Sequence, residues 1–513
     1  MKKISRISRA RRRSICQPPA SGQRPKLVTH QNVTTAVKEL IDYYRGFEPF
    51  FQRHEQSDWS WFYLCGQLSN LERKTIEPMV LGLLGAIPNA IRDLQRFMGE
   101  SKWDTTPFVA HLQTQVAAWL GERDGVAIVD GSGFPKQGKH SIGVAHQYCG
   151  HLGKIANCQE GVFLAYASRR GYSFLDERLY LPQEWFATDH GKLRKACRLP
   201  ESLQFQTEGE LALDMLQKLN KRALVPFAWV AYDESYGKNP AFADAIAALG
   251  KWYMAEVPGD TRVWLRTPLV EEPGPSRMGP PRLHRRVRRS APAPEEVRVL
   301  ARNLPRSAWH RHLIHEGSKG PLVAEFAVSR VTPIHDRLPS IRQWLICRRS
   351  AGPQPEEKFY LCNAPSHCPT PELIRVSGLR WPVETALEEN KGETGMDHYE
   401  TRTWWGWQSP AFSQDHQMLQ SFMAHLFLVR LCLVFQKKFL RSPSLKLGNS
   451  SPRRSRKTRD PLKMPWPRST TINGETMPRT ALIGSTLKRN FANAQKKRLV
   501  AKRRSNNQNV VVM

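Results

Sequence analysis

The spacing of apolar residues changes along the chain from a helical to a strand-like pattern. Between residues 27 and 120, apolar positions recur at three- and four-residue steps, the spacing that forms one buried face of a helix. Pro88 interrupts this pattern and predicts a break between two helices, because proline cannot donate the helical hydrogen bond. From about residue 125, the apolar residues form short runs separated by glycine and polar turns, which predicts strands.

Strand-like runs and helical segments alternate over the middle of the chain. The strand-like runs cover residues 126–129, 141–148, 162–167, 172–181, 227–232 and 252–257, and the helical segments cover 211–219 and 242–249. Residues 271–311 are rich in proline and arginine and predict a loop within a strand-rich stretch. A helix is expected from Pro382, since proline suits the first helical position, and another over 412–439. The sequence therefore predicts a mixed α/β fold.

The positive charge is concentrated at the two ends of the chain. The 513 residues include 77 Lys and Arg against 46 Asp and Glu, which gives a net charge of +31. Residues 1–26 hold nine basic and no acidic residues, and residues 441–513 hold eighteen basic residues against Asp460 and Glu475. Such tails either bind phosphate backbones or anionic surfaces, or remain solvated and disordered, and both interpretations stay open.

The composition favours a protein of the cytoplasm. No stretch approaches the ~20 apolar residues of a membrane span, and the N-terminus lacks the apolar core of a secretory signal. Its Arg- and Ser-rich composition suits an organelle transit peptide or a nucleic-acid-binding arm. The nine cysteines are scattered without a C-x-x-C pair, which indicates a reducing compartment and no disulfide scaffold.

Residues 133–139 match the spacing G-x-x-x-x-G-K of phosphate-binding loops. Such a loop requires Ser or Thr at the next position, to bind magnesium, and a helix that begins there. The chain has His140 at that position, followed by a strand-like run. A nucleoside triphosphatase that depends on Lys139 therefore remains only as an alternative hypothesis.

Separated carboxylates suggest a different chemistry. Asp130 and Asp233 each end an apolar run that is expected to be a core strand. Two such aspartates and a glutamate from a later helix can hold two divalent cations, which stabilise the attacking and leaving oxygens of phosphoryl transfer. Arg380, Glu384 and Lys391 have the spacing R-x3-E-x6-K, and residues seven apart share one helix face. The alternative for this segment is a surface helix with ion pairs.

Several ordered blocks resemble the DDE transposases of bacterial insertion sequences, and most of all the insertion-sequence seven-hundred-and-one type. The resemblance extends over about residues 40–432. It includes VDGSGFPKQGKHSIGVAHQYCGHLGKIANCQ from Val129, AYDESYG around Asp233 and KGETGMDHYETR at 391–402. These transposases carry their third carboxylate in a Y-x2-R-x3-E-x6-K signature. The chain has Ser377 where the signature has tyrosine, so the role of that tyrosine is lost or moved here.

The resemblance implies an RNase H-like catalytic core. Asp130, Asp233 and Glu384 match the three catalytic carboxylates, which are also the expected metal ligands. The implied cofactor is two Mg²⁺ ions, for which Mn²⁺ can substitute, because hard oxygen ligands suit these ions.

Four basic residues are expected to contact DNA. Arg380 and Lys391 match the basic residues of the signature, and Lys136 and Lys139 lie in the glycine-rich turn after Asp130. The expected partners are the terminal inverted repeats of the element, the target DNA and a second copy of the chain, because both element ends must be held together. No membrane partner is expected.

Six regions follow from these patterns. They are a basic disordered arm (1–26), a helical domain that either binds DNA, as we expect, or is a plain helical core (27–120), the first part of the core (121–261), a β-rich insertion with the Pro/Arg-rich loop (262–363), the second part of the core with the catalytic glutamate (364–440) and a basic disordered tail (441–513).

The sequence thus predicts a metal-dependent transposase that cleaves at the ends of an insertion sequence and transfers the 3′ ends into target DNA. It would act in the bacterial cytoplasm, at the nucleoid. The alternatives are a DNA-binding protein without catalysis, as a decayed transposase would be, and the triphosphatase described above.

Overall fold

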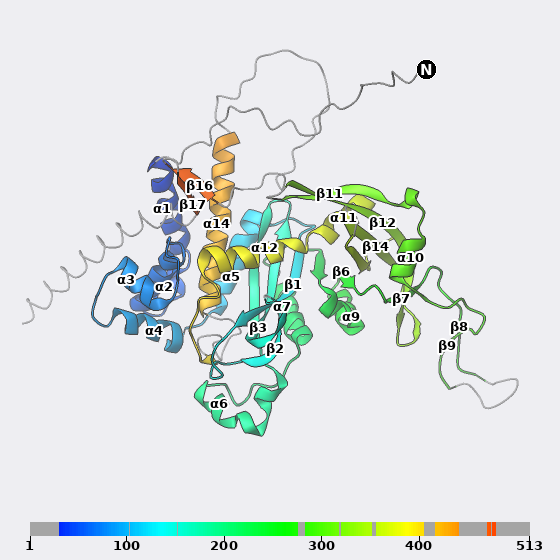
Figure 1. Cartoon of the computed structure of the whole chain (residues 1–513), viewed down its shortest axis with the longest axis horizontal. Helices are drawn as coiled ribbons and strands as arrows, with labels where there is room; N and C mark the ends of the chain where they lie inside the picture. Colours follow the sequence, from blue (N-terminus) through cyan, green and yellow to red (C-terminus); the bar gives the residue numbers. More distant parts are fainter. Residues whose placement is uncertain are drawn as a thin grey trace, which may run out of the picture.

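Helices at the N-terminal side pack against a large mixed β-sheet, which carries further helices on both faces (Figure 1). The computed structural model describes residues 30–101, 103–150, 152–274, 283–317, 320–350, 355–404, 416–440, 469–472 and 475–478. The predicted arm 1–26 and most of the tail 441–513 lie outside the described residues. The described part of the tail is a hairpin of β16 (Ser469–Ile472) and β17 (Glu475–Pro478), where the sequence predicted disorder.

The N-terminal region is helical, as the apolar spacing predicts. Its elements are α1 (His30–Arg45), η1 (Glu48–Phe50), α2 (His54–Gln67), α3 (Ile76–Leu83), α4 (Ala90–Glu100) and α5 (Thr106–Leu120). The predicted break at Pro88 falls between α3 and α4, where Gly85 and Asn89 adopt positive φ angles of 83° and 63°. Trp103 and Phe108, with ring centroids 4.5 Å apart, belong to the aromatic cluster that holds this helical region together.

The centre of the sheet has the RNase H-like strand arrangement, which confirms the predicted fold class. Its strands are β1 (Val126–Pro135), β3 (Lys154–Ser168), β4 (Gly171–Tyr180), β5 (Trp229–Tyr232) and β6 (Trp252–Val257). They lie in the order β4-β3-β1-β5-β6, with β3 antiparallel to both β1 and β4. β5 is parallel to β1 and to β6, so β1 is the central strand of this group.

The strand-rich insertion continues the same sheet, which has thirteen strands among the described residues. β15 (Glu357–Cys362) pairs with β6, and β14 (Gln343–Ser350), β12 (Gly320–His335), β7 (Arg262–Trp264) and β10 (Glu295–Glu296) follow in order. β11 (His310–Gly317) and β13 (Leu338–Pro339) pair with β12, β2 (Ala145–Cys149) pairs with β3, and β8 (Val270–Glu271) pairs with β9 (Arg286–Val287).

The prediction of a loop over residues 271–311 is wrong in part. This stretch includes the helix α10 (Val297–Asn303) and the short 3-10 helix η4 (Arg306–Ala308). Val297, Leu300 and Ala301 are buried at helical spacing, and this short pattern lies among prolines and arginines that dominate the composition.

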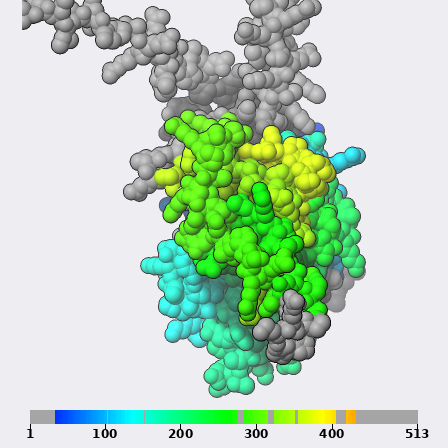
Figure 2. All heavy atoms as spheres, turned by 90° about the vertical axis from the view of Figure 1, so that its right-hand side faces the viewer, coloured from blue at the N-terminus to red at the C-terminus, as the bar shows by residue number. Residues whose placement is uncertain are grey.

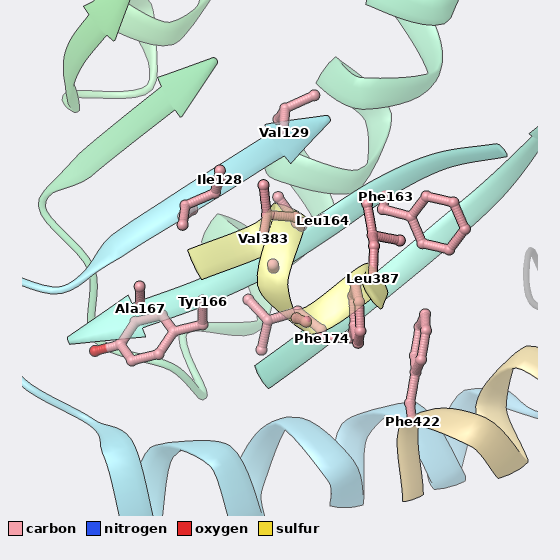
Figure 3. Close-up of a cluster of buried hydrophobic side chains, with 14 of the residues drawn as sticks. Ile128, Val129, Phe163, Leu164, Tyr166, Ala167, Phe174, Val383, Leu387 and Phe422 are labelled. Atoms are coloured by element: carbon pink, nitrogen blue, oxygen red, sulfur yellow. The ribbon is translucent and has the colours of Figure 1, made fainter. Parts of the chain in front are cut away.

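Helices cover both faces of the central strands. They are α7 (Glu208–Arg222), α8 (Glu234–Gly237), α9 (Pro240–Ala248), α11 (Thr370–Gly378), α12 (Trp381–Glu389) and α14 (His416–Leu440). The short helices η2 (Gln183–Phe186), η3 (Thr188–His190) and α6 (Gly191–Ala196) form a separate group that lies below the sheet in Figure 1. Val383 and Leu387 of α12 lie over β1 and β3 (Figure 3). Phe422 of α14 stacks on Phe174 of β4 at 4.5 Å, and α14 thereby joins the N-terminal helices to the sheet.

Candidate active site

The two predicted aspartates lie next to each other because of the register of two parallel strands. Val129 of β1 is aligned with Tyr232 of β5, and an aspartate is the next residue in each segment. Asp130 is 9% exposed. Asp233 begins α8 as its N-cap, where its Oδ1 accepts hydrogen bonds from the amide of Ser235 at 3.0 Å and from the Ser235 hydroxyl at 2.5 Å. The cap fixes the Asp233 side chain just after the end of β5, beside Asp130.

The helix α12 crosses the sheet in front of β1 (Figure 1) and brings two more predicted residues to this place. It begins at Trp381, with Pro382 in its first turn as expected. Arg380 Nη1 lies 3.4 Å from Asp130 Oδ2, and Nη2 lies 2.5 Å from Glu384 Oε1. Its Nε lies 3.1 Å from Glu256 Oε2. One partly buried guanidinium group therefore contacts three carboxylates from three elements.

The convergence of negative charge changes the acidity of Asp130. Burial raises its pKa, Arg380 opposes this shift, and the negative charges of Asp233 and Glu384 add to it. The resulting pKa of Asp130 is about 7. A carboxyl group whose charged form is this unfavourable gains most from a nearby cation.

Lys391 also lies at β1, but it reaches this strand from a π-helical turn and not from the continuous α-helix that was predicted. Its Nζ donates to Ser132 Oγ at 2.8 Å and to the carbonyl of Gly133 at 3.2 Å. The expectation of one continuous α-helix from Glu384 to Lys391 is wrong, because α12 ends at Glu389 and continues as the π-helical turn η5 (Asn390–Thr394). A π turn holds more residues than an α turn and therefore changes the direction in which Lys391 points.

The other two predicted DNA-binding lysines lie beyond the end of β1. Lys136 Nζ donates to the carbonyl of Tyr399 at 3.1 Å and lies 3.4 Å from the centre of its ring. Lys139 is exposed in the loop that follows. The structure thus brings Arg380 to Asp130 and Lys391 to Ser132 and Gly133, whereas Lys136 and Lys139 lie farther along the chain from Asp130.

The neighbouring glutamates of α12 and η5 have other surroundings. Glu389 Oε2 accepts a hydrogen bond from the Tyr172 hydroxyl at 3.1 Å and lies 3.4 Å from His425 Nε2. Glu388 is exposed, and Glu393 lies beside Lys74. Within this segment, Glu384 is the glutamate whose carboxylate contacts Arg380.

Ser377, at the place of the signature tyrosine, is buried in α11. Its hydroxyl donates to the carbonyl of Ile374 at 2.8 Å, within the same helix. The serine side chain therefore makes a local contact within its own helix. If the signature tyrosine contacts DNA, another residue has to make that contact in this chain.

Sequence reasoning missed two carboxylates at the site. Glu256 of β6 contacts Arg380 and also Lys358, whose Nζ lies 3.0 Å from Glu256 Oε1. Glu160 of β3 is aligned with Gly133 of β1. Burial, together with the nearby charge of Glu208, raises the pKa of Glu160 to about 8, while Lys391 lowers it.

The sequence signal for Glu256 was a single charged residue within the apolar run 252–257. Such a residue is equally typical of the exposed end of a strand, so it did not indicate a functional site. Glu160 had no signal, because only the pairing of β3 with β1 brings it near Asp130.

The donor set fits a hard divalent cation. The converging groups of Asp130, Asp233 and Glu384 are all carboxylate oxygens, which Mg²⁺ and Mn²⁺ prefer. In the described part of the chain, no three His, Cys, Asp or Glu side chains already surround a common metal position. Arg380 instead supplies the positive charge between Asp130 and Glu384. Glu384 is 44% exposed, so a cation held by its carboxylate would replace at least part of its contact with Arg380.

The loop after β1 does not have the geometry of a nucleotide-binding loop. β1 extends to Pro135, and the next element after Lys139 is the strand β2, which begins at Ala145. Without a helix N-terminus after the glycine-rich segment, the phosphate-binding arrangement of such loops is missing from this described segment.

The comparison with protein families identifies the chain. The family model described as DDE superfamily endonuclease matches residues 46–321, which is over half of the chain and includes Asp130 and Asp233. The chain belongs to the DDE superfamily endonucleases. Nucleases of this superfamily act on DNA and generally depend on divalent metal ions. A search of curated proteins found no match to the chain.

The family match also bears on the rest of this DDE endonuclease. It ends at residue 321, before α12, so it does not include the segment with Arg380 and Glu384.

None of the described helices combines the length and apolarity that crossing a bilayer requires.

Proposed function

We propose that this DDE endonuclease is the transposase of a bacterial insertion sequence, of the seven-hundred-and-one type with an R-x3-E-x6-K segment. It would cleave at the inverted-repeat ends of its element and join the released 3′ ends to target DNA. Because both ends must be held in one complex, we expect it to act as a homodimer. Its place of action would be the bacterial cytoplasm, at the nucleoid.

The observation that carries this proposal is the contact of Arg380 with both Asp130 and Glu384. Asp130 stands beside Asp233 in the central strands, and α12 adds Glu384 from a segment that the family match does not reach. Three carboxylates from two separate parts of the chain thus meet at the middle of an RNase H-like sheet.

Each residue has a distinct proposed role. Asp130, Asp233 and Glu384 would hold two Mg²⁺ or Mn²⁺ ions. Such ions activate water and stabilise the attacking and leaving oxygens of an in-line displacement. Arg380 favours the ionised form of Asp130 and keeps Glu384 directed toward it. Lys391 holds the part of β1 just after Asp130 in place.

The chemistry consists of two similar displacements at phosphorus. In the first, the oxygen of water bonds to phosphorus at the end of the element, the bond to the 3′ oxygen breaks, and that oxygen leaves as a hydroxyl group. In the second, the 3′ hydroxyl oxygen bonds to a target phosphorus and displaces another 3′ oxygen. No covalent bond between protein and DNA is needed in either step.

The test uses the full chain and labelled DNA that carries an element end with its flanking sequence. With Mg²⁺ or Mn²⁺ we expect cleavage at the element boundary, free 3′ hydroxyl ends and joined products, none of which should form in EDTA. Asp130→Asn should abolish all products. Asp336→Asn is the matched control, because Asp336 is exposed on the insertion and its φ of 48° suits asparagine. Metal-independent binding without any cleavage would instead identify a DNA-binding protein without catalysis.

A further inference from the structure

A cavity of about 560 Å³ lies beyond the end of β1. It is bounded by the loop after β1, the hairpin of β2 and β3, and the segment from η2 to α6. Part of its wall is apolar and is formed by Val144, Ala145, Leu193 and Ala196. We refer to this cavity as the α6 pocket. In Figure 2, the blue-green region that includes the α6 segment is at the lower end of the molecule, and the cyan region that includes the hairpin is at the left, beside the green insertion.

The remaining wall of the α6 pocket is basic. Lysine and histidine side chains come from all three bounding segments: Lys139, His140, His146, His190 and Lys192. Glu184 is the acidic residue among the lining side chains. The combination of an apolar wall with two lysines and three imidazole side chains suits a ligand with an apolar ring and an anionic group.

Hydrogen bonds hold the walls of the α6 pocket in place. The Asn157 amide donates to the carbonyls of Lys136 at 2.6 Å and Gly138 at 3.0 Å, and so fixes the loop after β1. Trp185 Nε1 donates to the carbonyl of Val144 at 3.1 Å, and Cys197 Sγ lies 3.3 Å from the carbonyl of His140. The pocket is therefore formed before any ligand binds, which lowers the entropic cost of binding.

One face of the adjoining hairpin extends the α6 pocket outward. His146 and Tyr148 are two residues apart on β2 and therefore share a face, and their partners on β3 are Asn157 and Ile155. His146 and Asn157 line the pocket, whereas Tyr148 and Ile155 lie one step farther out and are 65% and 61% exposed. An exposed aromatic ring next to a basic pocket is the arrangement on which unpaired bases stack.

We propose that the α6 pocket and this hairpin face bind an unpaired segment of the DNA strand. The inference rests on the proposed function only in taking DNA as the substrate. One base would lie against the apolar wall, its phosphate beside Lys139 and Lys192, and a neighbouring base against Tyr148. A paired duplex cannot place a base in the cavity, because its bases are stacked inside the helix.

The position of the α6 pocket relates it to the cleavage site. β1 leads from Asp130 to Pro135, and five strand residues at ~3.3 Å each span about 17 Å. Successive phosphates of one strand are about 3.4 Å apart along a duplex, so this distance corresponds to roughly five nucleotides. The unpaired segment would therefore lie a few nucleotides from the phosphate that is cut.

The test measures DNA binding by fluorescence anisotropy in EDTA, so that cleavage plays no part. The probes are a blunt duplex, the same duplex with a five-nucleotide 5′ or 3′ overhang, and the overhang duplex with abasic sites in place of the five bases. We expect one of the two overhangs to bind about tenfold more tightly than the blunt duplex. The abasic overhang, which keeps the phosphates, should lose most of this gain.

Variants test whether the tighter binding of overhang DNA depends on the α6 pocket. Tyr148→Ala and the cavity-filling Ala196→Leu should each reduce the preference for the overhang several-fold while binding of the blunt duplex stays within twofold. Lys139→Ala with Lys192→Ala should remove the preference and reduce the salt dependence of overhang binding. Lys221→Ala is the control, because Lys221 is an exposed lysine at the far end of α7.

The outcomes separate this inference from the proposed function. Equal binding of blunt and overhang DNA, absence of any DNA binding, or an unchanged preference in all the pocket variants would overturn the inference. Equal loss of blunt and overhang binding in the lysine double variant would show that the pocket only contacts duplex backbone. Cleavage with metal, measured separately, decides the proposed function.

Discussion

Arg380 and Asp130 are 250 residues apart in the sequence, yet Arg380 Nη1 lies 3.4 Å from Asp130 Oδ2. The contact joins α12 to the central strand of the sheet. It also links the part of the chain that matches the endonuclease family to the part that follows it. Because the same guanidinium contacts Glu384 and Glu256, its removal changes the charge balance of the whole cluster.

Arg380→Ala should reduce DNA cleavage at neutral pH by about 100-fold or more and shift its pH profile to higher pH. The reason is that Arg380 lowers the pKa of Asp130, so its loss raises that pKa and more base is needed to ionise the carboxyl group. Arg380→Lys should keep part of the cleavage activity, and its pH profile should shift less than that of Arg380→Ala. Cleavage rates from pH 6 to 9 check this prediction, and an unshifted profile in Arg380→Ala would contradict it.

Glu384→Gln should abolish cleavage of element-end DNA while binding survives, since the change removes a charge with almost no change in volume. Glu388→Gln is the matched control, because Glu388 is one helical turn further along α12 and exposed. It should keep most of the activity. Gel-based cleavage and binding assays on the same DNA measure both properties. Loss of cleavage only in Glu388→Gln would show that the third carboxylate is assigned to the wrong residue.

Asp130→Asn should stabilise the metal-free protein at pH 8 and have little effect at pH 4. The pKa of Asp130 is raised from its ordinary value of 3.8 to about 7, so its ionisation costs stability as the pH rises through this window. Asparagine resembles the protonated form and avoids that cost. Thermal unfolding in EDTA at several pH values tests this, and added Mg²⁺ should raise the Tm of the wild type more than that of the variant. A variant less stable than the wild type at pH 8 would refute it.

Phe422→Ala should destabilise the protein by about 3–5 kcal/mol. Phe422 is fully buried and stacks on Phe174, so its loss leaves a cavity between α14 and the sheet. Leu269→Ala, at a side chain that is 66% exposed, should change the stability by less than about 0.5 kcal/mol. Denaturant unfolding of both variants gives the comparison, and similar effects in the two would mean that α14 does not depend on this contact.

Deletion of residues 441–513 should weaken binding to all DNA and reduce its salt dependence. The segment holds eighteen basic residues against two acidic ones, and phosphate contacts position a protein without reading bases. The preference for element ends should therefore remain. Binding constants for end-containing and random DNA at several salt concentrations test this. Selective loss of end binding would assign a specific role to the tail.

The local pattern of the sequence was sufficient for the central strands and for the order of the site residues. The run that ends at Asp233 folds as β5, and Pro382 lies in the first turn of α12. The prediction that Asp130 ends its strand is wrong, because β1 continues to Pro135 through its pairing with β3. The pattern could not reveal Glu256 or Glu160, because their proximity to the site depends on which strands pair. It also could not reveal the π turn at Asn390–Thr394, since no residue type in it distinguishes a π from an α turn.

The division into six regions stays a prediction, and the strand pairing shows that the insertion is joined to the core through one sheet. Composition alone marks 262–363 as a separate β-rich unit. The pairing of β15 with β6, however, makes its strands part of the same sheet as the catalytic strands.

The pairing of β6 with β15 has a consequence for the solubility of shortened forms. In the intact chain, the backbone groups of β6 are paired with β5 on one side and β15 on the other. Excision of the insertion would leave β6 as an open edge, with unpaired amides and carbonyls next to an apolar core strand. Such an edge readily pairs with a strand of another molecule. A version trimmed to the central strands alone should therefore aggregate, even if every residue of the carboxylate cluster is kept.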